Sequence, residues 1–107
     1  MSFNFKTKII NYKQSTQELP QFPKDNTDIM IIEDNTGCSF YRNLLIKEYP
    51  NLEKIVVGEK SFQYLNSLTI CNCEKLKTIE VEDDAFYNIN NVTFERITHE
   101  IILCISS

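Results

Sequence analysis

Residues 52–73, LEKIVVGEKSFQYLNSLTICNC, align without a gap on residues 76–97, LKTIEVEDDAFYNINNVTFERI, at a shift of 24. Apolar residues recur at the same places in both segments, whereas the residues between them change in charge and size. A fixed period of about 20 to 50 residues is typical of repeat architectures, in which inward positions fill a shared core. The matched apolar pairs are Leu52–Leu76, Ile55–Ile79, Val57–Val81, Phe62–Phe86, Leu65–Ile89, Leu68–Val92, Ile70–Phe94 and Cys73–Ile97.

Each repeat contains two strand-like stretches, Leu-x-x-Ile-x-Val at 52–57 and Leu-x-x-Leu-x-Ile-x-x-Cys at 65–73. Alternate residues of a strand face opposite sides. The inward residues are then Ile55, Val57, Leu68 and Ile70, and the outward ones Val56 and Thr69. Like strands of successive repeats should lie side by side. We therefore expect a β-rich repeat solenoid of stacked coils of about 24 residues, with two short parallel sheets and little helix.

The connections between these strands should be tight turns around 58–60 and 71–74. The chain has only two glycines and three prolines, so Asn, Asp, Lys and Glu must take the turn positions. Phe62 and Phe86 should stack where each coil bends. The best helix candidate is 15–19, where Ser15-Thr16-Gln17-Glu18 has capping-box spacing before a proline.

The chain should form one domain, given its 107 residues. We divide it into an N-terminal cap (1–27), a degenerate repeat (28–51), two full repeats (52–75 and 76–99) and a partial C-terminal coil (100–107).

Two segments deviate from the full repeats. In the degenerate repeat, Ile29 and Ile31 mark the first strand, 34–37 forms a longer turn, and Ser39-Phe40 takes the place of Ser61-Phe62. In the cap, Phe3–Tyr12 alternates partly and should pair over the first coil.

The repeat resembles the leucine-rich repeat, and more closely its BspA-like variety. The resemblance covers about residues 12–97 and rests on the strand pattern followed by the pairs Ser39-Phe40, Ser61-Phe62 and Ala85-Phe86. It implies a leucine-rich-repeat-like fold that binds other proteins, often at a cell surface. The family's Phe-x-x-Cys element is Phe-x-x-Leu and Phe-x-x-Ile here.

Composition limits the classes of partner and the cellular locations that we expect. The hydrophobic content of 42% favours a folded domain, and the net charge of -4 disfavours nucleic acid as a partner. Met1–Ile10 has no secretory apolar run, so the default expectation is a cytoplasmic protein, and the longest apolar tract, Ile101–Ile105, is too short for a membrane span. The cysteines, which could form two disulfides, are expected to be reduced. They are Cys38, Cys71, Cys73 and Cys104.

No catalytic constellation emerges. His99 is the only histidine, the glycines are Gly37 and Gly58 alone, and Cys71-x-Cys73 is too closely spaced for a typical zinc pair. The acidic group at 80–84 lacks EF-hand spacing. We expect no enzyme activity, no cofactor and no metal.

The outward positions should therefore carry the function. The candidate protein-binding surface comprises Asn66, Ser67, Thr69, Asn90, Asn91 and Thr93, with Tyr64 and Tyr87 near the bends as possible anchors. Two interpretations remain open. One is a protein-protein interaction module that uses this surface, and the other is a structural or oligomerisation unit, or a fragment of a longer array, that associates through its open C-terminal edge at 101–105.

Overall fold

The computed structural model describes residues 4–7, 16–18, 23–36, 42–97 and 100–105. These residues form nine short strands and no helix. The strands are β1 (Asn4–Thr7), β2 (Thr16–Glu18), β3 (Ile29–Ile32), β4 (Asn43–Lys47), β5 (Lys54–Val57), β6 (Ser67–Cys71), β7 (Thr78–Val81), β8 (Asn91–Glu95) and β9 (Ile102–Ile105).

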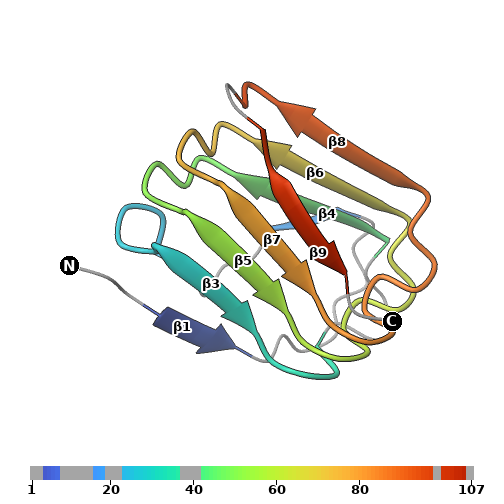
Figure 1. Cartoon of the computed structure of the whole chain (residues 1–107). Helices are drawn as coiled ribbons and strands as arrows, with labels where there is room; N and C mark the ends of the chain where they lie inside the picture. Colours follow the sequence, from blue (N-terminus) through green and yellow to red (C-terminus); the bar gives the residue numbers. More distant parts are fainter. Residues whose placement is uncertain (1–3, 8–15, 19–22, 37–41, 98–99, 106–107) are drawn as a thin grey trace.

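The strands build two parallel sheets, which confirms that part of the sequence prediction. One sheet has the order β1-β3-β5-β7-β9 and the other the order β2-β4-β6-β8, so the chain alternates between the sheets from strand to strand. Figure 1 shows the two sheets face to face, with the strands of one running opposite to those of the other.

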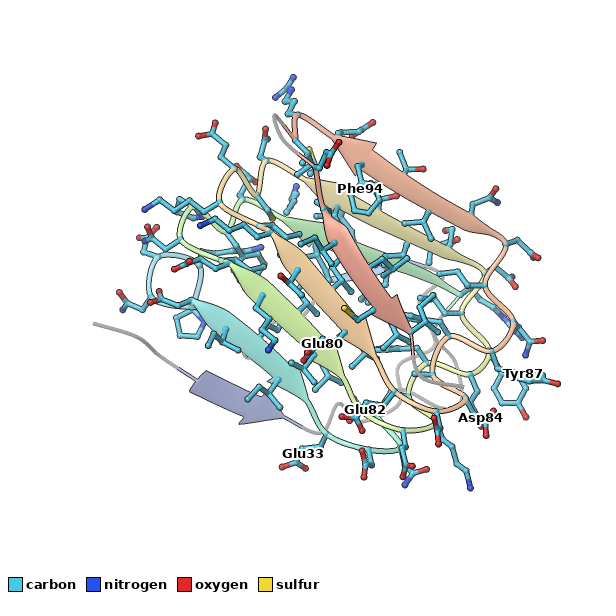
Figure 2. All side chains as sticks on the ribbon, viewed as in Figure 1. Glu33, Glu80, Glu82, Asp84, Tyr87 and Phe94 are labelled. Atoms are coloured by element: carbon cyan, nitrogen blue, oxygen red, sulfur yellow. The ribbon has the colours of Figure 1, made fainter. Side chains whose placement is uncertain are left out.

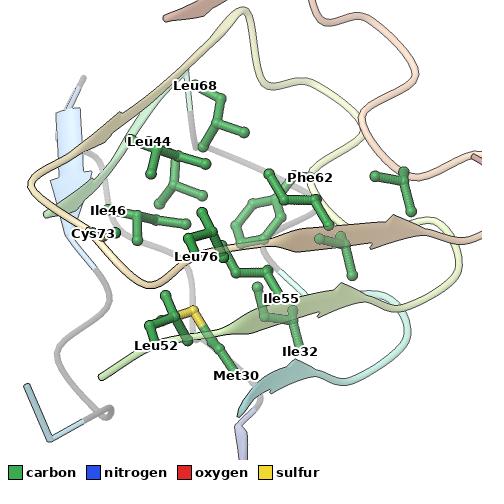
Figure 3. Close-up of a cluster of buried hydrophobic side chains, with 14 of the residues drawn as sticks. Met30, Ile32, Leu44, Ile46, Leu52, Ile55, Phe62, Leu68, Cys73 and Leu76 are labelled. Atoms are coloured by element: carbon green, nitrogen blue, oxygen red, sulfur yellow. The ribbon is translucent and has the colours of Figure 1, made fainter. Parts of the chain in front are cut away.

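The period of 24 is the register of the sheets in the second half of the chain. Ile55 pairs with Ile79 in one sheet and Leu68 with Leu44 and Val92 in the other. As predicted, the inward rows are buried: Ile55, Val57, Leu68 and Ile70 are each at most 4% exposed. They pack with residues of the preceding and following strands into one core (Figure 3).

The degenerate repeat is where the predicted phase is wrong. The strand expected at Ile29 and Ile31 exists, but β3 pairs with β5 at a shift of 25, with Met30 opposite Ile55. A shift of one residue exchanges the two faces of a strand. Met30 and Ile32 are therefore the core residues, at 0% and 1% exposure.

The additional residue lies in the connection between β3 and β4, and it moves the bend pair as well. Thr36, not Ser39, takes the place of Ser61: its carbonyl accepts a hydrogen bond from Phe62 N, as the Ser61 carbonyl does from Phe86 N. Thr36 and Ser61 are both fully buried. The predicted pair Ser39-Phe40 itself lies outside the described residues.

The bends follow the prediction in chemistry and add one surprise. Non-glycine residues with positive φ recur along the chain, and most are of the four types expected for these turns: Asn35, Glu48, Lys60, Asn72 and Asp84. Arg96 also has positive φ, although arginine was not among the expected types. Phe62 and Phe86 also have positive φ, at 54° and 55°. Their rings stack with centroids 5.8 Å apart, as predicted. Aromatic packing thus holds a backbone conformation that is uncommon for a bulky residue.

Gly58 is required by a close approach. A Cβ atom at this position would lie 2.6 Å from the backbone nitrogen of Asp34 and 2.6 Å from its Oδ1. Asp34 Oδ1 also accepts a hydrogen bond from Glu59 N. The described part of the predicted longer turn, up to Thr36, is no longer than its counterpart, because residues 33–36 match residues 58–61 one for one at the shift of 25. The two turns lie directly against each other at Gly58 and Asp34.

The helix prediction for 15–19 is wrong where the structure describes it. Thr16–Glu18 is strand β2, which pairs with Asn43, Leu44 and Leu45 of β4. Capping-box spacing is a local signal, and pairing with a neighbouring strand overrides it. At the other predicted cap element, Asn4–Thr7 forms β1 on β3, in agreement with the expected strand. None of the described elements is a helix that could cross a membrane.

Candidate interaction surfaces

The first candidate surface is the C-terminal end face, which we define as the inward-row residues of β8 and β9. They are in register with the buried rows of β6 and β7, yet nothing among the described residues covers them. The covered residues Leu68, Ile70, Ile79 and Val81 are 4%, 0%, 2% and 5% exposed. Their counterparts Val92, Phe94, Leu103 and Ile105 are 48%, 42%, 54% and 66% exposed.

The end face also has free strand edges. Within the described residues, β8 pairs only with β6 and β9 only with β7, so the outer edge of each strand has backbone groups without a strand partner. Figure 1 shows both strands as the outermost of their sheets at the same end of the molecule. An apolar surface bordered by unpaired edges favours addition of another strand.

Four further apolar residues lie in the connections next to the end face. Phe86, Ile89, Ile97 and Ile101 are half-buried and pack against the core. They come from the connections on either side of β8. The end face is thus the exposed top of the ordered core and not a separate cluster.

The second candidate surface is the polar face predicted from the sequence, on the outer side of β6 and β8. The structure brings its residues into rows: Ser67 pairs with Asn91, and Thr69 with Thr93. Asn66 and Asn90 precede the two strands, and Asn90 N donates to Asn66 O at 2.9 Å. The row extends to Asn43 of β4, whose Oδ1 accepts a hydrogen bond from Ser67 Oγ.

The predicted tyrosine anchors do not align with each other. Tyr64 and Tyr87 are 51% and 72% exposed. The register of 24 places Asn88, and not Tyr87, above Tyr64, and Asn88 Nδ2 donates to the Gln63 carbonyl at 2.7 Å. Figure 2 shows Tyr87 projecting from a bend. The tyrosines thus flank the polar face without forming one stacked row.

The acidic group at 80–84 divides between a sheet and a turn. Glu80 lies on β7 and forms an ion pair of 3.1 Å with Lys54 of β5. Glu82 and Asp84 lie in the following turn (Figure 2). No group of three or more His, Cys, Asp or Glu side chains suited to a metal occurs within the described parts of the chain. His99 lies outside them.

The described cysteines are free thiols in three different environments. Cys73 is fully buried, Cys71 is half-buried and Cys104 is exposed on β9. Burial raises the pKa of the Cys73 thiol above its usual value, and the backbone hydrogen bond from Tyr49 lowers it only in part. Cys73 therefore fills the core, as its match to Ile97 predicted, and Cys38 lies outside the described residues.

Comparison with known proteins adds nothing to these observations, since no family model, no curated protein and no solved structure matches the chain.

Sequence reasoning found part of the end face and missed the rest. It anticipated an open edge at 101–105, but treated Val92 and Phe94 as core because they match Leu68 and Ile70. The exposure of Val92 and Phe94 follows from the place of β8, which is the outermost described strand of its sheet. A residue of the last full strand of a sheet has no following row to cover it, whatever its match to earlier repeats.

Proposed function

We propose that this protein is a non-enzymatic protein–protein interaction module with a leucine-rich-repeat-like solenoid architecture, and that its principal binding surface is the C-terminal end face. The architecture is supported by the two parallel ladders, the repeated register of 24 and the stacked Phe62 and Phe86 at equivalent bends. The BspA-like pattern of Ser61-Phe62 and Ala85-Phe86 fits the same interpretation.

The observation that carries the function is the contrast in exposure between equivalent rows. Each end-face side chain is about half exposed, whereas its counterpart one strand earlier is buried. Completing its burial would contribute roughly 1 kcal/mol per residue, because full burial of a large aliphatic or aromatic side chain contributes about 1.5–3 kcal/mol. Four such residues side by side, with two free strand edges, form a binding surface rather than scattered surface apolar residues.

The alternative is a structural role that uses the same end of the molecule. In that case the protein is an oligomerisation unit, or a fragment of a longer repeat array, and the end face is covered by another repeat. The two roles share one surface and differ in what occupies it.

The test is the molar mass in solution, measured by light scattering over a hundredfold range of concentration. We expect the wild-type protein to associate and Ile105→Lys to abolish the association, because a charge would be placed in the apolar row. Circular dichroism establishes that the variant is folded. The matched control is Thr69→Lys, which adds the same charge on the outer face of β6 and should leave the association unchanged.

The outcomes separate the two candidate surfaces. Association lost in Thr69→Lys and retained in Ile105→Lys would assign binding to the polar face of Ser67, Thr69, Asn91 and Thr93. That face is favoured as a second candidate by its regular rows and by the exposure of both asparagines that precede them. A wild-type protein that is monomeric at every concentration would contradict self-association through the end face.

A further inference from the structure

We infer that the end face is covered by a second copy of this chain, related by a twofold axis parallel to the strands, so that β9 of each copy pairs antiparallel with β8 of the other. This inference rests on the proposed role of the end face, and it specifies the partner and the pairing. Its first basis is strand direction. β8 and β9 run in opposite directions at the same end of the molecule (Figure 1). A twofold rotation about an axis parallel to the strands places the two end faces against each other. It brings β8 of one copy beside β9 of the other copy, in antiparallel orientation.

Side-chain orientation and strand length then select the register. Residues directly opposite in an antiparallel pair point to the same face of the sheet, so inward residues must meet inward residues. Pairing Leu103 with Phe94 of the second copy, and Ile105 with Val92 of the second copy, satisfies this condition. It also places Cys104 opposite Thr93 and Ile102 opposite Glu95. All four residues of β9 are then paired, and the inward contacts are apolar on both sides.

Symmetry favours this pairing over the junction of like strands. When β9 of each copy pairs with β8 of the other, the twofold axis makes the two contacts identical. Both contacts then have the same strand spacing, even if β8 and β9 lie at different heights in the stack. When β9 pairs with β9 and β8 with β8, the two contacts are not equivalent. Both can then have the strand spacing of about 4.8 Å only if β8 and β9 lie at the same height in the stack. The mixed pairing also yields two continuous nine-stranded sheets, since one sheet contributes five strands and the other four.

The exposed apolar rows suit a second copy of the chain. Val92, Phe94, Leu103 and Ile105 are 48%, 42%, 54% and 66% exposed. A second copy presents the same apolar rows and the same free strand edges to them.

Charge does not oppose the contact. Along β8 and β9 only Glu95 is charged, and in the proposed register it lies opposite Ile102 and not opposite another acid. A twofold contact is also closed, because the same surface is used on both copies and no further copy can add. Association of the end face with the opposite end of another copy would instead leave a free end at each step and produce filaments.

The test is an engineered disulfide between Thr93→Cys and the native Cys104. Directly opposed residues of an antiparallel pair have Cα atoms about 4.5–5.5 Å apart, within the range of about 4.4–6.8 Å that a disulfide needs. Within one copy these two positions project outward from different sheets, so the bond can form only between copies. Cys38→Ser and Cys71→Ser in the background remove competing thiols, and Cys73 is buried.

We expect mild oxidation to convert Thr93→Cys quantitatively into a covalent dimer that a reductant reverses and that Cys104→Ser abolishes. The matched control, Thr69→Cys, lies on the same outer face one strand farther from the end. This adds about 4.8 Å to its distance from Cys104 of the second copy, which places it beyond disulfide reach, and it should not cross-link.

Each other outcome overturns the pairing. A covalent dimer formed through Cys104 alone would place β9 against β9, and a ladder of higher species would indicate association of unlike ends. No cross-link in a protein that light scattering shows to associate through Ile105 would leave the proposed function standing and refute the β8–β9 register. A monomer at every concentration would refute self-association itself.

Discussion

The covered rows of β6 and β7 and the open rows of β8 and β9 carry the same kind of residue at the same repeat position. Ile70 and Phe94 occupy matched places on neighbouring strands, and so do Ile79 and Leu103. One member of each pair is at most 2% exposed and the other at least 42% exposed. The difference arises from the neighbour on the far side and not from the residue itself.

This contrast shows that, in a stack of strands, the exposed fraction of an inward residue depends on the position of its strand in the stack. The hydrophobic pattern specifies which side of a strand faces inward. Whether that side is buried from solvent depends on the presence of a next strand. The end of such an array is therefore apolar by construction unless its sequence changes. Here the sequence of β8 and β9 continues the interior pattern, so the inward residues of these two strands are apolar and exposed among the described residues.

The largest expected effect on stability comes from truncating the buried residue of a matched pair. Ile79→Ala should lower the free energy of unfolding by about 2–5 kcal/mol, because it leaves a cavity in the packed core. Leu103→Ala, the same kind of change one strand later, should cost less than about half as much for the monomer, because water already reaches that side chain. Urea unfolding of both variants at low protein concentration measures the difference. Equal losses would contradict the contrast.

The next effect concerns the turns that hold the covered rows in place. Gly58→Ala should destabilise the protein by roughly 1–3 kcal/mol, because the new methyl group would overlap the backbone of Asp34. Glu82 occupies the equivalent position one repeat later, where it is exposed. Glu82→Ala should therefore change the stability by no more than about 0.5 kcal/mol. Thermal unfolding of the two variants compares them, and a neutral Gly58→Ala would refute the close approach.

A smaller effect separates a fully buried hydroxyl group from a half-buried one on the outer face. Ser61 Oγ donates to the Glu33 carbonyl at 2.8 Å and accepts from Thr36 N at 3.1 Å. Ser61→Ala should lower the free energy of unfolding by about 1–2 kcal/mol, because both buried hydrogen bonds of the hydroxyl group are lost. Ala85, the counterpart of Ser61, shows that the methyl group fits such a site. Ser67→Ala, on the outer face, should have a much smaller effect in the same chemical denaturation. Equal effects would argue against a role for the buried hydrogen bonds.

The sequence predicted most of the regular part of the fold, and particular residues explain the failures. The period of 24 identified the strand positions and the inward faces from Leu52 onward, because matched apolar residues must share a core. It holds for β4 as well, but it failed at β3 and the turn that follows, because the connection from β3 to β4 has one additional residue. Only the pairing of Met30 with Ile55 reveals this change of register. At Thr16–Glu18 a local helix signal was outweighed by a sheet neighbour distant in sequence.

The candidate site was predicted less completely than the fold. Outward residues such as Thr69 and Thr93 were placed correctly in rows, because the alternation of a strand is a local property. The exposure of Val92 and Phe94 depends on what lies beyond the last row. No periodicity within the repeats carries that information.

The smallest effect is expected from the thiols. Burial raises the pKa of Cys73 above its usual value of 9.0, so its ionised form is disfavoured in the folded protein. Its contribution to stability is therefore fully present below about pH 9 and is lost as the pH rises through the raised folded-state pKa. Cys104 should react with a thiol reagent in the folded protein at pH 8, whereas Cys73 should react only on unfolding. Mass spectrometry of the labelled chain distinguishes them, and rapid labelling of Cys73 would contradict its burial.

The most direct test of the central claim is amide hydrogen exchange of β9, compared with β7, as a function of protein concentration. If β9 continues the interior pattern and is covered by association, its amides should be protected almost as strongly as those of β7 at high concentration. They should lose that protection on dilution, while β7 remains unchanged. Exchange of β9 that is fast and independent of concentration would contradict the account, because the apolar end would then be stable as an exposed surface.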